Sequence, residues 1–116
     1  MAARTKRIVT FVPKPGFKAR YRDFLKLNPD IRKPIEDFNV LKRLIPPGRL
    51  PNTMKDHTLK GRLKGIGECH LAGDILLLYF HSDDVVNLLD VCTHDELHGE
   101  IGRAAAAYVK ALKLRG

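Results

Sequence analysis

Three histidines and an aspartate are the side chains of this sequence best suited to proton-transfer chemistry near neutral pH. His57, His70 and Asp74 lie in one stretch, residues 55–74, and His94 follows later. Imidazole has an unperturbed pKa of about 6.5, so it can donate or accept a proton under physiological conditions. The same stretch carries fixed positive charges at Lys55, Lys60, Arg62 and Lys64. Titratable rings among cations indicate a site for an anionic substrate.

Other interpretations of these residues remain open at this level. A single histidine at the end of a strand is more often a surface or hydrogen-bonded residue than a catalyst, and His81, in a turn-like sequence, is interpreted in that way. Clustered His, Asp and Cys also suggest zinc, but no HxxxH or CxxC pair presets two ligands. Cys69 and Cys92, without such spacing, are expected to be reduced and buried as small apolar residues. No metal ligand and no cofactor is therefore predicted.

Charge narrows the partners that this chain can take. Its 116 residues carry 21 Lys+Arg against 13 Asp+Glu, a formal net charge of +8, while 44% hydrophobic residues favour a folded chain. Such an excess favours a polyanionic partner, although it can also serve solubility alone. The longest apolar run, residues 75–80, is far shorter than the ~20 residues that cross a bilayer. With no signal peptide evident at the N-terminus, we expect a cytoplasmic protein without a membrane partner.

The elements that must position these residues follow from periodicity. A strand is predicted over residues 7–12, and apolar stripes at helical spacing predict two helices over 17–25 and 31–45, separated at Asn28-Pro29. Strands are predicted over 61–71, 74–80 and 84–93, the middle one apolar throughout and so covered on both faces. Thr93 and Glu96 have capping-box spacing and begin a final helix. The order β-α-α-β-β-β-α predicts a single α+β domain over 1–116: a twisted, mostly antiparallel sheet, a helical hairpin on one face, and an extended C-terminal helix over 99–116.

Strand alternation then indicates which side chains share a face. Over 61–71 it places Arg62, Lys64 and His70 together, and over 84–93 it places Asp90 and Cys92 on the face of His94. If that face is open, the three histidines and Asp74 converge on a basic, concave surface.

Taken in order, these motifs resemble the YafQ-like branch of the RelE/ParE toxin superfamily. The resemblance rests on three motifs: "DHxLxG" at residues 56–61, "CHLxxD" at 69–74, and a "TH" that closes the last strand before a capped helix. The resemblance implies a small basic toxin of a bacterial type II toxin–antitoxin system that cuts mRNA in the ribosomal A site. It also implies an acidic antitoxin as partner.

The resemblance carries the active site over to His57, His70, Asp74 and His94. Metal-free RNA cleavage needs a base for the 2′-hydroxyl, an acid for the departing 5′-oxygen and positive charge at the phosphorus. We assign His94 as general acid, and His70 or Asp74 as the base or the orienting partner of that base. His57 would be a second proton-transfer group or a phosphate contact. Lys55, Lys60, Arg62 and Lys64 would hold the RNA backbone.

Two positions depart from the family pattern. His98 stands where many members have an aromatic residue on which a base stacks; imidazole can stack too, and it adds a candidate acid. Asp90 stands where relatives often carry arginine, and its carboxylate would repel phosphate unless it pairs with His94 or an arginine. Alternatives to cleavage therefore stay open: a ParE-like protein that binds DNA gyrase, or a degenerate toxin that binds only its antitoxin.

Overall fold

A computed structural model describes residues 9–43, 48–82 and 84–114. Five strands form one sheet in the order β1-β5-β4-β3-β2. β1 (Thr10–Pro13) runs parallel to β5 (Val85–Thr93), whereas β4 (Ile75–Ser82), β3 (Gly67–Ala72) and β2 (His57–Thr58) continue the sheet in antiparallel fashion. The predicted α+β fold with a mostly antiparallel sheet is confirmed.

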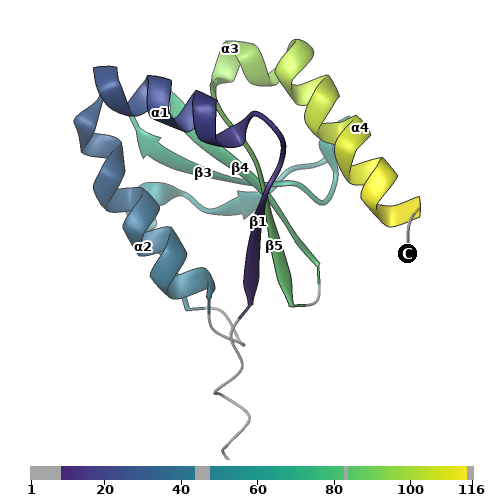
Figure 1. Cartoon of the computed structure of the whole chain (residues 1–116), viewed down its shortest axis with the longest axis horizontal. Helices are drawn as coiled ribbons and strands as arrows, with labels where there is room; N and C mark the ends of the chain where they lie inside the picture. The colour runs from purple at the N-terminus through teal and green to yellow at the C-terminus, as the bar shows by residue number, and fades with distance from the viewer. Residues whose placement is uncertain (1–8, 44–47, 83, 115–116) are drawn as a thin grey trace, which may run out of the picture.

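The N-terminal helices cover one face of the sheet (Figure 1). α1 (Phe17–Leu27) is followed by the short 3-10 helix η2 (Pro29–Ile31) and by α2 (Arg32–Lys42). Phe17, Ile31 and Phe38 from this hairpin pack with side chains of β3, β4 and β5 in one buried cluster. Ile45 of the predicted second helix lies outside the described residues.

The C-terminal helices cover the opposite face (Figure 1). α3 (His94–Leu97) and α4 (Glu100–Leu114) contribute Leu97, Ala105 and Val109 to a second buried cluster with Leu76 and Leu78 of β4. β4 is thus buried on both sides, as its uniformly apolar sequence predicts. None of the helices in the described residues is long and apolar enough to cross a membrane.

The predicted strand over residues 61–71 is wrong in its first half. Residues Gly61–Leu63 form a 3-10 helix, η4, and β3 begins only at Gly67. Gly61 and Gly65 have φ values of 68° and 93°, a left-handed backbone that glycine adopts readily and that interrupts a strand. The short strand β2 was not predicted, since two polar residues carry no periodicity.

The final helix begins as predicted but is not continuous. Thr93 and Glu96 form the capping box, the side chain of each accepting a hydrogen bond from the other's backbone N–H. The chain then turns at His98 and Gly99 before α4 begins. α4 packs so closely that a Cβ at Gly102 would lie 1.9 Å from the Leu97 carbonyl oxygen. This contact ties α4 to the helix that carries His94.

Candidate active site

His70 and His94 meet at the edge of the sheet where β3 and β5 end and β4 begins. His70 is in β3, and His94 follows β5 directly as the first residue of α3. The β4–β5 register pairs Ile75 with Thr93, which brings Asp74 next to His94. The two imidazole rings are 5.4 Å apart between centroids, edge to face at 61°. Residues far apart in the sequence therefore form one cluster.

Asp74 fixes the orientation of His94. Its carboxylate accepts hydrogen bonds from His94 Nδ1 and from the His94 backbone N–H, the latter at 3.2 Å. These bonds lower the pKa of Asp74, so the group is ionised at neutral pH. Because the carboxylate only accepts, Nδ1 of His94 carries a proton, and Nε2 is left to exchange one with a substrate.

Glu68 is a member of the cluster that the sequence did not identify as a site residue. Its side chain is only 5% exposed, and Oε1 lies 3.3 Å from His57 Nε2 and 3.8 Å from His70 Nε2. His57 Nδ1 lies 2.7 Å from the Lys55 carbonyl oxygen, which can only accept, so Nδ1 holds the proton and Nε2 faces Glu68. Glu68 thus joins His57 to His70. Its position two residues before His70 indicated that both side chains share one face of the strand. The sequence did not reveal β2, the strand that brings His57 to Glu68.

The surroundings of His70 favour its neutral form. Partial burial lowers the pKa of this imidazole most, and the nearby His94, Lys55 and His57 lower it further, while Glu68 opposes them. The net pKa lies below the ordinary value for histidine. A neutral imidazole at pH 7 is able to accept a proton.

A partly buried contact holds the segment that carries His57. The Tyr79 hydroxyl donates to Asp56, and Lys42 Nζ lies 2.7 Å from the other Asp56 carboxylate oxygen. Burial and this acceptor raise the pKa of Tyr79, which keeps the hydroxyl protonated as a donor. The Tyr79 ring lies over Gly67, where a Cβ would come within 2.2–2.6 Å of ring atoms. The aspartate of "DHxLxG" therefore positions the histidine after it.

Asp90 does not pair with His94, so the shared face predicted for the two residues does not bring them together. Arg20 of α1 donates through Nε to Asp90 at 3.1 Å, and through Nη2 to the Val91 carbonyl and to Glu96 at 2.9 and 3.0 Å. Asp90 also accepts from the Val91 N–H at 2.9 Å. An arginine thus neutralises this carboxylate, one of the two arrangements that the sequence left open. The same arginine holds Glu96, and with it the start of α3.

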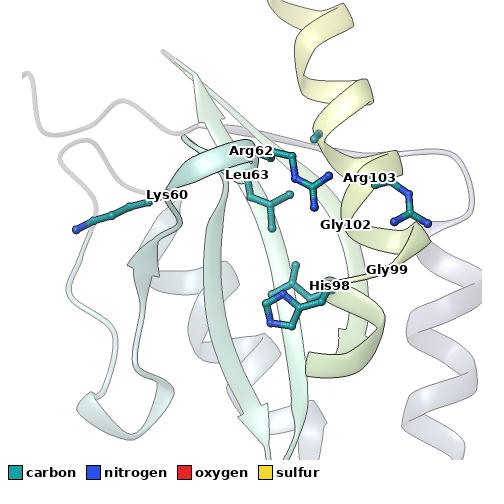
Figure 2. A pocket seen from close by; sticks show the side chains of 9 residues that line it. Lys60, Arg62, Leu63, His98, Gly99, Gly102 and Arg103 are labelled. Carbon is teal, nitrogen blue, oxygen red and sulfur yellow. The ribbon is translucent and has the colours of Figure 1, made fainter.

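The predicted RNA-binding residues are divided between the cluster and a neighbouring cavity. Lys55 lines a hollow with His70. Lys60, Arg62 and His98 instead line a cavity of about 320 Å³ between η4 and α4, into which His98 points (Figure 2). Arg62 and Lys64 were expected on one strand face with His70. They instead precede that strand and line cavities beside α4. Within the described residues, the His98 side chain takes no part in the hydrogen bonds, ion pairs and ring contacts of His57, His70, Asp74 and His94.

The two cysteines are core residues, as the sequence predicts. Cys69 and Cys92 are both fully buried, one on each face of the sheet. Burial raises the pKa of each thiol to about 12, which leaves no reactive thiolate.

Three side chains of the cluster are placed to hold a metal ion. One ligand atom each from Glu68, His70 and His94 lies within 4.8 Å of the others. Two imidazole nitrogens and a carboxylate oxygen are a donor set that suits zinc or copper. Glu68 and His70 both lie in β3 and His94 begins α3, so the set has neither the HxxxH nor the CxxC spacing that the sequence analysis looked for.

Comparisons with known proteins find similar bacterial toxins. The model for the family described as "Bacterial toxin of type II toxin-antitoxin system, YafQ" matches residues 9–99. A copper-bound mutant toxin from Helicobacter pylori has 26% sequence identity and a TM-score of 0.63, and the match covers 78% of this chain and 99% of that one. YafQ from Escherichia coli has 22% identity and a TM-score of 0.63 over the same shares of the two chains.

A further match is YafQ within the E. coli DinJ–YafQ toxin–antitoxin complex, with 23% identity, a TM-score of 0.60, and coverage of 78% of this chain and 98% of that one. No curated protein matches the chain. The E. coli structures are similar in fold, and the family match spans most of the sequence. The chain therefore belongs to the YafQ family of bacterial toxins of type II toxin–antitoxin systems.

Proposed function

We propose that this toxin is a ribosome-dependent mRNA endoribonuclease that cleaves by attack of the RNA 2′-hydroxyl. The observation that carries the proposal is the pair of imidazoles, His70 and His94, 5.4 Å apart, with Asp74 bonded to the second ring. The attacking 2′-oxygen and the departing 5′-oxygen share one phosphorus atom, so an acid and a base this close can serve both.

The roles of the two rings follow from their environments. His70, with its lowered pKa, is the base that takes the proton of the 2′-hydroxyl. His94, held through Nδ1 by ionised Asp74, delivers a proton from Nε2 to the 5′-oxygen. The products are a 2′,3′-cyclic phosphate and a free 5′-hydroxyl. The sequence analysis assigned Asp74 to the base or to the orienting partner of the base; in this proposal Asp74 instead orients the acid, His94.

His57 and Lys55 complete the site on the side of β2. His57 is half exposed, and its two ring nitrogens face the Lys55 carbonyl and Glu68, so the ring is held beside His70 at the edge of the site. Lys55 lies along the hollow that His70 also lines and adds a fixed positive charge. The buried Glu68 carboxylate contacts the rings of both His57 and His70 and so fixes their relative position.

Cleavage by this route needs no metal ion. A metal bound at Glu68, His70 and His94 would occupy the nitrogen atoms that must exchange protons. A mutant of the similar H. pylori toxin is copper-bound in its crystal structure. We expect cleavage by this chain to withstand EDTA and to be inhibited by added Cu²⁺, which an RNase assay with and without each reagent measures.

We also propose an acidic antitoxin as the cellular partner. The similar E. coli YafQ forms a complex with DinJ. A net charge of +8 favours an acidic protein that covers the basic surface near the C-terminal helix. Such binding would block access to the cluster and stabilise the toxin by mass action.

The test is primer extension on a translated reporter mRNA after induction of the toxin. The proposal predicts new 5′ ends with the wild type and with His81→Ala, a control histidine at the other end of β4. It predicts none with His94→Ala or His70→Ala. An intact message during growth arrest by the wild-type chain would overturn the proposal and favour a toxin that acts by binding alone.

A further inference from the structure

A basic groove lies between the η4 segment and α4, next to the histidine cluster. It consists of two adjoining cavities of about 320 and 360 Å³ that share Arg62 in their linings. Neither lining includes a carboxylate. The first cavity is also lined by the His98 imidazole. The cationic side chains come from both walls of the groove: Lys60, Arg62, Lys64, Arg103, Lys110 and Lys113. Figure 2 shows Arg62, Arg103 and His98 around the first cavity.

The charges of this groove are available to a ligand. Within the described part of the chain, no ion pair with a carboxylate involves Lys60, Arg62, Lys64, Arg103 or Lys110. Arg103, Lys110 and Lys113 are exposed. Unpaired cations at this density repel one another, so they are stabilised when a polyanion is bound.

The spacing along α4 matches an extended strand. Arg103, Lys110 and Lys113 share one side of the helix, and a rise of about 1.5 Å per residue separates the first from the last by about 15 Å. Between Arg103 and Lys110 the helix lines the groove with Ala106, Ala107 and the buried Val109, none of which is long or charged. A backbone can therefore approach α4 closely while the cations contact successive phosphates.

Two short segments connect the groove to the cluster. β2 carries His57, and Lys60 follows it; α3 begins with His94, and His98 follows one turn later, its N–H 3.3 Å from the His94 carbonyl oxygen. A ligand at the histidines thus continues into the groove, where the His98 imidazole can stack on a base.

We propose that α4 and η4 form a track that holds single-stranded RNA on one side of the cleavage site. This inference rests on the proposed nuclease function and adds a binding segment to it. α4 lies beyond the family match, which ends at residue 99. The track is therefore a feature that this chain's own C-terminal helix supplies.

The test measures binding of a short, fluorescein-labelled single-stranded RNA to the full chain by anisotropy across a KCl series. All proteins carry His94→Ala so that the RNA stays intact. The track variant adds Arg103→Gln and Lys110→Gln; the control adds Arg22→Gln and Lys26→Gln, two exposed cations on α1, on the other face of the sheet. Both lose two positive charges, and the exposed sites leave the buried clusters intact.

Each phosphate contact contributes about −0.7 to the slope of log K against log salt for single strands. The proposal predicts that the slope of the track variant is shallower by about 1.4, and that the slope of the control equals that of the parent. An unchanged slope in the track variant, or an equal change in the control, would overturn it. The proposal would also be overturned if the track variant lost binding to poly-glutamate but kept its binding to RNA. That result would assign the groove to an acidic protein. The assay reads binding alone, so a failure of the nuclease proposal would be seen separately, in the primer-extension test.

Discussion

Replacing Glu68 by glutamine tests whether the buried carboxylate sets the protonation of His70. Glutamine keeps the shape of the side chain and removes its charge. A negative charge stabilises the protonated imidazole, so its removal lowers the pKa of His70 further. Because His70 acts as a base in its neutral form, the rising limb of the pH–rate profile should move to lower pH.

The size of this shift follows from the distance between the groups. With Glu68 Oε1 and His70 Nε2 3.8 Å apart, Coulomb's law gives about 1 kcal/mol in water and about 4 kcal/mol at an effective dielectric constant of about 20. These energies correspond to shifts of about 1 to 3 pKa units. The His70 side chain is 22% exposed, so solvent screens the pair, and we expect a shift of about one unit.

The assay is a titration of the histidine ring signals by NMR, with the pH–rate profile of RNA cleavage as a second readout. In the wild type the pKa of His70 should lie below about 6.5. Glu68→Gln should lower this pKa, and His94→Ala, which removes a nearby positive charge, should raise it. Asp23→Asn, the same charge change at an exposed site on α1, should leave it unchanged. An unchanged or raised pKa in Glu68→Gln would refute the assigned geometry.

Three further substitutions test the groups that support the cluster. Asp74→Asn should lower kcat with little change in KM. The loss should be smaller than the ~10²–10⁴-fold loss in kcat expected when the acid is removed in His94→Ala. A loss in Asp74→Asn as large as that in His94→Ala would argue against an orienting role. Gly67→Ala should destabilise the fold by about 1–3 kcal/mol in urea unfolding, because the added methyl overlaps the Tyr79 ring; unchanged stability would contradict this contact. Arg20→Ala should cost about 1–2 kcal/mol in the same assay through lost charged hydrogen bonds to Asp90 and Glu96, whereas Arg22→Ala, its exposed neighbour, should cost almost nothing.

The fold could be predicted from the sequence where local patterns decide it. The amphipathic stripes of α1 and α2, the apolar β4 and the Thr93–Glu96 capping box each specify an element without reference to the rest of the chain. Residues 61–66 could not be predicted in this way. Their alternation of apolar and basic residues mimics a strand, whereas the positive φ angles of Gly61 and Gly65 make a 3-10 turn.

The candidate site was predictable only as far as the motifs reach. The motifs identified His57, His70, Asp74 and His94, and the structure brings them together. Glu68 and Arg20 were missed, because their roles depend on tertiary pairing: Glu68 lies opposite His57 across an unpredicted strand pair, and Arg20 reaches Asp90 from another layer. The division of the basic residues between the cluster and the α4 groove likewise depends on where η4 turns.

The measurement that tests the central claim most directly is the chemistry of the cleaved RNA ends. The substrate is one RNA cut by the wild-type toxin, compared with the same RNA carrying a single 2′-deoxynucleotide at the cut position. If His70 deprotonates a 2′-hydroxyl while His94 protonates the 5′-oxygen, mass spectrometry will show a 2′,3′-cyclic phosphate and a 5′-hydroxyl, and the deoxy substitution will abolish that cut. A 5′-phosphate product, or undiminished cleavage at the 2′-deoxynucleotide, would contradict the account.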